Sequence, residues 1–213
     1  MAVSFDLFGT LVDVDRPSDP AAAVARELAA RGVPVPADWA IAYRERHVDA
    51  PPGAEVPLPA HVAAALASRG IDAPGNAARR AVVAAFDPAV ERRPGARAAI
   101  EGVRERGLGP VGLLSNCAVP ELVARTLLRA GLRDAFDATV ASVGCGWRKP
   151  DRRAFAAVAR GLDVPLADLV HVGDDPRTDG GAVDAGGRFV DVGEVPLDDV
   201  PAVLARPDAE GDP

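Results

Sequence analysis

From residue 95 onward, the chain alternates between segments typical of strands and segments typical of amphipathic helices. Strands are predicted over residues 111–114, 139–141, 169–172 and 188–192. Helices are predicted before and between these strands, over residues 95–106, 120–130 and 151–160. Strands that alternate with helices are joined by right-handed crossovers and form a parallel sheet covered on both faces. This half of the chain therefore predicts a doubly wound α/β core.

The first strand of this core lies far from the others in the sequence. An apolar strand pattern covers residues 2–7, and short alanine-rich helices broken by proline and glycine follow, over residues 21–30, 38–47, 60–68 and 77–86. We predict an α/β protein with a doubly wound, Rossmann-like parallel-sheet core over residues 1–16 and 92–213. A small all-helical cap domain is predicted over residues 17–91. We expect an exposed proline-rich loop over residues 49–59 and a frayed tail over residues 206–213.

Charge and composition exclude several classes of protein. The 24 basic and 31 acidic residues give a net charge of −7, which argues against a general nucleic-acid binder. No apolar run approaches the roughly 20 residues that span a membrane, and Asp6 and Asp13 interrupt the apolar N-terminus of the chain. The two cysteines, Cys117 and Cys145, are too few for a disulfide framework. We expect a cytoplasmic monomer or homodimer that acts on a small molecule, without nucleic-acid or membrane partners.

In sheets of this kind, ligands bind outside the carboxyl ends of the strands. Several polar residues of this chain lie near the predicted strands at such positions. They are Asp6 after the first strand, Ser115 and Asn116 after the second, Lys149 before a later helix, and Asp174, Asp175 and Asp179 after the strand 169–172. Each has an ordinary alternative as a turn residue or helix cap. Lys149 is the single lysine of the sequence, and its compact ammonium is not equivalent to a guanidinium. Together these residues predict one site.

Four segments carry a family resemblance. The segments DLFGTL at residues 6–11, LLSN at 113–116, the lysine at 149 and GDDPRTD at 173–179 resemble, in order, the four motifs of the haloacid dehalogenase superfamily. A helical cap between the first two motifs is also similar to that family. The resemblance implies that Asp6 is a nucleophile that forms a covalent intermediate, with Ser115 and Lys149 as the other catalytic residues. It also implies that the substrate is bound by Leu7, Phe8, Thr10 and Asn116.

The predicted site carries more negative charge than one lysine offsets. Carboxylates held a few ångströms apart raise one another's pKa values and would protonate the nucleophile. A hard divalent cation with oxygen ligands removes this conflict, and Mg²⁺ fits that description. By resemblance, its ligands are the Asp6 side chain, the Phe8 backbone carbonyl and Asp174. Asp175 and Asp179 would act in the outer sphere or through water, although Asp179 has the alternative of a helix cap.

Phe8 departs from the pattern of the family's phosphatases, which carry an aspartate at this position that protonates the leaving oxygen. The loss of a general acid costs roughly 10²–10⁴-fold in rate. We expect a phosphatase-like hydrolase that uses Mg²⁺ and acts on a small organic phosphate with a good leaving group. Two alternatives stay open. One is a metal-independent 2-haloacid dehalogenase, whose departing halide needs no proton, and the other is an inactive protein that only binds a ligand.

Trp39, Tyr43 and His47 recur at four-residue spacing on the predicted helix 38–47. Such a stripe either faces the site, where it would select the substrate, or packs the helices of the cap together. We expect the packing role for Trp39 and Tyr43.

Overall fold

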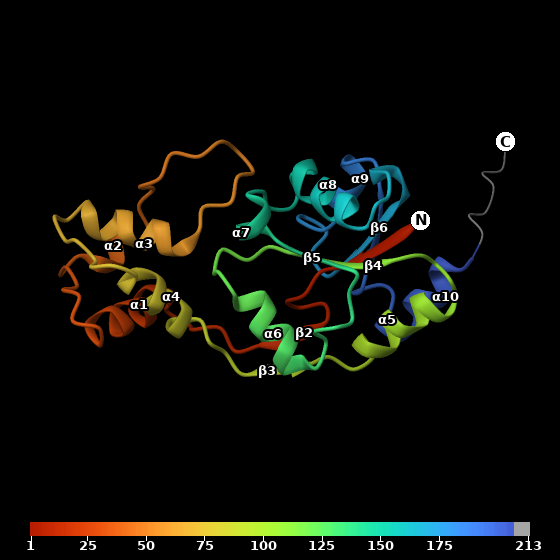
Figure 1. The fold of residues 1–213 in the computed structure, drawn as a ribbon, viewed down its shortest axis with the longest axis horizontal. Coiled ribbons are helices and arrows are strands. Elements are labelled where there is room, and N and C mark those ends of the chain that lie inside the picture. Colours follow the sequence, from red (N-terminus) through yellow and green to blue (C-terminus); the bar gives the residue numbers. More distant parts are fainter. Residues whose placement is uncertain (207–213) are drawn as a thin grey trace.

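A parallel five-stranded sheet forms the centre of the protein in a computed structural model, which describes residues 1–206 (Figure 1). The strand order is β5-β4-β1-β6-β7. Their bounds are β1, Ala2–Phe5; β4, Val111–Ser115; β5, Ala138–Ala141; β6, Leu169–Gly173; and β7, Arg188–Asp191. Phe5 is in register with Leu113 on one side and with Val172 on the other. The carboxyl ends of β1, β4 and β6 therefore meet at one edge of the sheet.

Helices cover both faces of this sheet, and the predicted fold class is confirmed. Val3 and Phe5 pack into one hydrophobic cluster, with helices α5, Ala96–Glu105; α6, Leu122–Ala130; and α10, Val200–Leu204. Ala2 packs into a second cluster, with α8, Arg152–Gly161, and α9, Gly181–Asp184. Neighbouring residues of a strand point to opposite faces, so the continuous apolar strands are buried on both sides.

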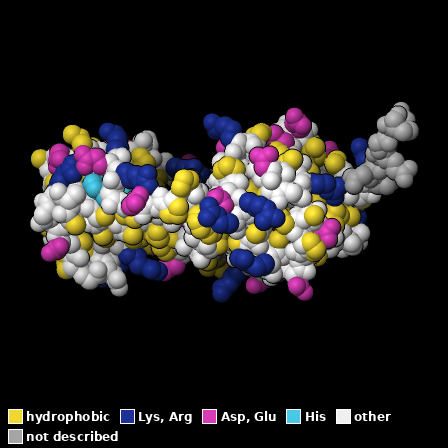
Figure 2. Space-filling model, turned by 90° about the horizontal axis from the view of Figure 1, so that it is seen from above, with side chains coloured by type: hydrophobic (Ala, Val, Ile, Leu, Met, Phe, Trp, Pro, Cys, Tyr) yellow, Lys and Arg dark blue, Asp and Glu magenta, His cyan; other side chains and the backbone are white. Residues whose placement is uncertain are grey.

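The first part of the segment between β1 and β4, before α5, contributes four helices beside the core, on the left in Figure 1. They are α1, Pro20–Ala29; α2, Trp39–Ala42; α3, Leu58–Ala67; and α4, Ala77–Ala85. In the space-filling view, a waist separates this helical lobe from the core (Figure 2). The exact limits of a cap domain at residues 17–91 remain a prediction, and residues 207–213 of the predicted core and tail lie outside the described residues.

Two short strands that the sequence analysis did not predict lie where the chain leaves the core and returns to it. β2, Val12–Val14, and β3, Val90–Arg92, form an antiparallel pair in which Val12 is opposite Arg92. Three-residue strands carry almost no local pattern, and their pairing joins segments far apart in the sequence. This ribbon connects the helical lobe to the core.

The proline-rich loop is half-buried against the core over residues 53–59, so the prediction of an exposed loop is wrong for that part. The backbone amide of Glu55 donates to Gly146 O at 2.9 Å, and the amide of Arg148 donates to Gly53 O at 3.0 Å. Leu58 and Pro59 already belong to α3. Another short helix, α7, Ser142–Cys145, opens the segment that this loop contacts.

Helix α2 ends at Ala42 and not at residue 47, so the length predicted for it is wrong. His47 Nε2 hydrogen-bonds to Ala42 O, and His61 Nε2 to Tyr43 O, both at 2.7 Å. These side chains occupy the carbonyls that the next helical turn would use. Trp39 is buried, and its ring lies 5.7 Å from that of Tyr43, so this stripe packs within the helical lobe. None of the helices among the described residues has the length and apolar character to cross a membrane.

Candidate active site

Asp6 follows β1 directly and is 7% exposed. Its Oδ1 accepts a hydrogen bond from Lys149 Nζ at 2.7 Å, and the backbone amide of Leu7 also donates to the carboxylate. Burial raises the pKa of Asp6 to about 6, and the charge of Asp179 adds to the rise, while Lys149 opposes it. The carboxylate therefore needs additional positive charge to stay fully ionised near neutral pH.

Lys149 is the centre of a buried hydrogen-bond network. Its ammonium donates to Asp6 Oδ1 at 2.7 Å, to Leu114 O at 2.9 Å and to Asp179 Oδ1 at 2.5 Å, which uses all three of its N–H groups. Asn116 fixes the backbone of this lysine from both sides: the Lys149 amide donates to its Oδ1 at 2.8 Å, and its Nδ2 donates to Lys149 O at 3.0 Å. The side chain of Asn116 thus positions the lysine.

Asp179 receives three donors and does not act as a simple helix cap. Oδ1 accepts from Lys149 and lies 3.1 Å from His171 Nε2, and Oδ2 accepts from the Asp175 amide at 3.1 Å. Burial disfavours the ionised form, but the hydrogen bonds from His171 and Lys149 and the charge of Lys149 together hold the pKa of Asp179 well below its usual value. The carboxylate is therefore ionised at neutral pH.

His171 supports this network from the interior of β6. It is fully buried, and burial, aided by the charge of Lys149, lowers its pKa to about 4, so it is neutral at pH 7. Because the three hydrogens of Lys149 are used elsewhere, His171 Nε2 carries a hydrogen and donates to Asp179. Its Nδ1, 2.8 Å from Ser4 Oγ, accepts from that hydroxyl. His171 lies inside the predicted strand 169–172, where nothing in the sequence marks it as functional.

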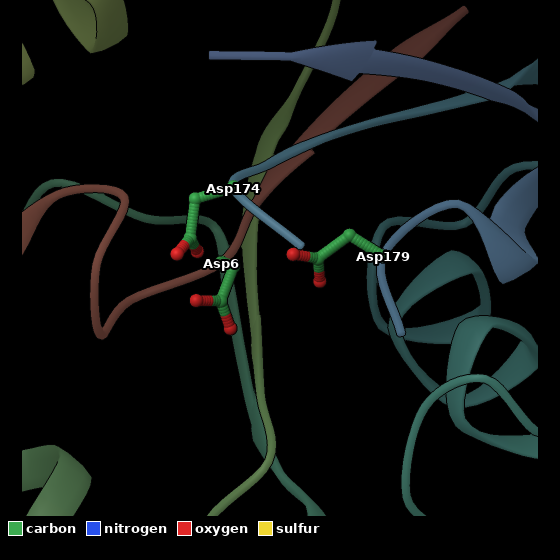
Figure 3. Close-up of side chains that lie close together, drawn as sticks. All are labelled: Asp6, Asp174 and Asp179. Carbon is green, nitrogen blue, oxygen red and sulfur yellow. The ribbon is translucent and has the colours of Figure 1, made fainter. Parts of the chain in front are cut away.

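Three carboxylates converge at the edge of the sheet. In Figure 3 the side chains of Asp6, Asp174 and Asp179 lie close together, and one oxygen of each lies within 4.8 Å of the others. Thr10 Oγ1 donates to Asp174 Oδ1 at 2.9 Å, so this threonine, predicted as a substrate-binding residue, orients a carboxylate. Hard oxygen donors at this spacing fit a divalent cation such as Mg²⁺.

Gly9 allows Asp174 to approach the nucleophile. Its φ of +90° lies in the left-handed region, and a Cβ at this position would be 2.4 Å from Asp174 Oδ2. Only glycine tolerates both the conformation and the contact.

The remaining predicted residues are placed as follows. Asp175 lies outside the carboxylate cluster, and its Oδ1 accepts from the backbone amide and Nε of Arg177, although its side chain borders the same cavity. Ser115 is fully buried, and its Oγ has no hydrogen-bond partner among the described residues. Ser115 is not among the residues that line the cavity around the carboxylate cluster, so its contact with a substrate stays a prediction. Leu7 is fully buried, so any contribution to binding comes from its backbone.

A cavity of about 300 Å³ contains this cluster. Besides predicted residues, it is lined by three that the sequence analysis missed, namely Arg16, Arg148 and Thr178. Arg148 adjoins the lysine in sequence and could have been suspected from that position. Thr178 lies within the segment 173–179 that resembles the fourth motif, whereas nothing in the sequence distinguishes Arg16 from the other arginines.

Comparison with known proteins agrees with this geometry. The family model of haloacid dehalogenase-like hydrolases matches residues 1–187. A phosphatase of Mycobacterium tuberculosis is 40% identical over 82 residues, which are 38% of this chain and only 37% of that relative's length. The crystal structure of a 2-haloacid dehalogenase from Pseudomonas syringae has a TM-score of 0.69 at 24% identity, with 96% of this chain and 98% of that chain covered.

A second solved structure, that of a HAD phosphatase from Thermococcus onnurineus, has a TM-score of 0.58 at 18% identity, and the match covers 96% of this chain and 97% of that chain. At such identities the likeness shows the shared fold. The family model covers most of the chain and includes every residue of the carboxylate cluster. The protein therefore belongs to the haloacid dehalogenase-like hydrolases.

Proposed function

We propose that this hydrolase is a Mg²⁺-dependent phosphatase that uses Asp6 as its nucleophile and acts on a small organic phosphate with a good leaving group. The observation that carries the proposal is the cluster of Asp6, Asp174 and Asp179, whose oxygens lie within 4.8 Å of one another beside a single ammonium. A phosphate dianion could not enter such a cluster unless further positive charge were present. The partial match to a phosphatase supports the same class of substrate.

The donor set favours particular residues as ligands of the cation. Asp6 and Asp174 would hold it together with the backbone carbonyl of Phe8, since the oxygens of Asp179 are already engaged by three donors. When bound, Mg²⁺ supplies positive charge that offsets the charges of phosphate and carboxylates. Asp175 stays outside this sphere and orders the loop through Arg177.

The chain's own residues account for the reaction steps. Asp6 attacks the phosphorus while Lys149 holds its Oδ1, and the bond from phosphorus to the leaving oxygen breaks. The leaving group departs as an oxyanion because Phe8 has no proton to give. Ser115 Oγ donates to a phosphate oxygen. Water then hydrolyses the aspartyl phosphate, which releases inorganic phosphate and restores the carboxylate of Asp6.

A metal-replacement assay tests this proposal. We expect hydrolysis of 4-nitrophenyl phosphate and acetyl phosphate with Mg²⁺, loss of that activity with EDTA, and its return when excess Mg²⁺ is added. Asp6→Asn should abolish turnover under all of these conditions. Chelator-insensitive hydrolysis, or an Asp6→Asn variant as fast as the parent, would overturn the assignment.

One observation favours a second function, the hydrolysis of a carbon–halogen bond. Phe8 borders the cavity where a phosphatase needs an acid, and a departing halide requires no proton. Chloride release from 2-chloropropionate in EDTA distinguishes the two reactions. Release that does not depend on metal establishes the second function and excludes the first.

A further inference from the structure

A second cavity, of about 500 Å³, opens beside the carboxylate cluster and extends between the core and the helical lobe. Phe8, Arg16 and Asn116 line both this cavity and the one that holds the cluster. The second cavity is lined by apolar side chains together with the charged side chains of Asp15, Arg16, Arg26, Glu27 and Asp87. The apolar ones come from the start of the chain, from α1, from the end of α4 and from the start of α6, and they include Phe8, Val14, Pro17, Ala23, Phe86 and Leu122. A group of moderate size attached to a bound phosphate would enter it.

Arg16 lies at the junction of the two cavities. Its guanidinium carbon is 5.6 Å from the centroid of the Phe8 ring, a cation–π contact. Arg16 has no ion-pair partner among the described residues, whereas two of the carboxylates that line the larger cavity are already paired, Glu27 with Arg31 and Asp87 with Arg125. The guanidinium is therefore held by an aromatic ring and keeps its hydrogen-bond donors for a ligand.

The position of this arginine matches a requirement of the reaction. Without an acid at residue 8, the leaving oxygen acquires a full negative charge as its bond to phosphorus breaks. A guanidinium stays charged at every relevant pH and cannot act as an acid, but it stabilises an oxyanion by charge and hydrogen bonds. The oxygen that links the two parts of the substrate must lie where the two cavities meet, beside Phe8 and Arg16.

We propose that Arg16 is a catalytic residue that stabilises the departing oxyanion, and that the apolar cavity binds the aryl or acyl part of the substrate. This inference rests on the proposed phosphatase function and narrows its substrate class. The substrates are phosphomonoesters of phenols or mixed anhydrides of carboxylic acids, with an apolar body of one ring or a comparable branched chain. Attack by Asp6 forms the aspartyl phosphate, and the phenolate or carboxylate leaves without a proton, against Arg16.

The kinetic test uses Arg16→Ala, Arg16→Lys and a control. Arg160→Ala is the matched control, because Arg160 is exposed on α8, outside both cavities. We expect Arg16→Ala to lower kcat on aryl phosphates by about 10²–10³-fold, with a larger loss for phenols of higher pKa. Arg16→Lys should retain part of the rate, and added guanidinium should partly restore Arg16→Ala. A loss confined to KM, or no loss, overturns the catalytic role.

A binding measurement separates this inference from the proposed function. By calorimetry in EDTA, the parent protein and Arg160→Ala should bind 4-nitrophenolate and benzoate, with binding at least about tenfold weaker in Arg16→Ala. If the parent hydrolyses aryl phosphates but Arg16→Ala changes neither kcat nor binding, the inference fails and the proposed function stands. If binding depends on Arg16 but no phosphate is hydrolysed, the proposed function and the catalytic role fail, and only the oxyanion site remains.

Discussion

The Lys149 ammonium lies 2.5 Å from Asp179 Oδ1, and both side chains are almost completely buried. The same ammonium lies 2.7 Å from Asp6 Oδ1. One positive charge thus serves two carboxylates in a region that water hardly reaches. In such a buried region, removing one charged partner destabilises the folded protein by more than the ion pair stabilises it, because the remaining charge is left uncompensated.

The first prediction concerns Lys149→Met, which keeps the length of the side chain and removes its charge. Asp6 and Asp179 would then face each other without the ammonium, and we expect the free energy of unfolding to fall by about 3–5 kcal/mol at pH 8. Urea unfolding in EDTA measures this change in the free energy of unfolding. Combining the change with Asp179→Asn should recover part of the loss. A single variant as stable as the parent would show that the charge is not needed for folding.

Sequence patterns predicted the core well because its signals are local. Continuous apolar strands alternate with amphipathic helices after residue 95, and each of these strands was found within two residues of its predicted bounds. The polar residues at strand ends were then brought together by the topology of a parallel sheet. The close approach of Asp6 and Asp179 follows from the neighbouring positions of β1 and β6, and Asn116, which follows β4, holds the backbone of Lys149 beside them.

Features that depend on distant partners were not predictable in this way. His47 and His61 end α2 by side-chain hydrogen bonds that no periodicity encodes. The pairing of β2 with β3 joins residues nearly eighty positions apart, Val12 and Arg92 among them. Arg16 follows β2 and lines both cavities, but its sequence neighbourhood contains no motif.

The second prediction concerns Gly9→Ala. The new Cβ would lie 2.4 Å from Asp174 Oδ2 at a φ of +90°, so it strains the backbone and displaces a carboxylate of the cluster. We expect a loss of stability of about 1–3 kcal/mol and at least about tenfold weaker Mg²⁺ activation. Gly32→Ala is the matched control, since Gly32 has a φ of +72° but nothing within 4 Å of its Cβ position. Equal Mg²⁺ activation in both variants would contradict the proposed placement of Asp174.

The third prediction concerns Phe8→Asp, which introduces the missing acid. Turnover of an alkyl phosphate should rise by at least about tenfold, because a poor leaving group benefits from protonation, whereas turnover of 4-nitrophenyl phosphate should change little. Phe8→Asn opens the same wall of the cavity without supplying a proton, and it should give no gain. If neither phosphate responds to the aspartate, protonation of the leaving group does not limit the reaction.

The fourth prediction concerns the dependence of stability on pH. Burial raises the pKa of Asp6 from 3.8 to about 6, so between these values the folded protein binds a proton that the unfolded chain has released. The stability that this proton contributes is fully present below about pH 4 and is lost as the pH rises through 6. The asparagine of Asp6→Asn cannot ionise. In EDTA, the free energy of unfolding of this variant relative to that of the parent should therefore rise by about 3 kcal/mol between pH 4 and pH 7.5. Urea unfolding across this range measures the trend, with Asp72→Asn, which removes an exposed carboxylate, as the control. Saturating Mg²⁺ should shrink the difference because it favours the ionised parent. A difference that does not vary with pH would mean that folding does not shift the pKa of Asp6.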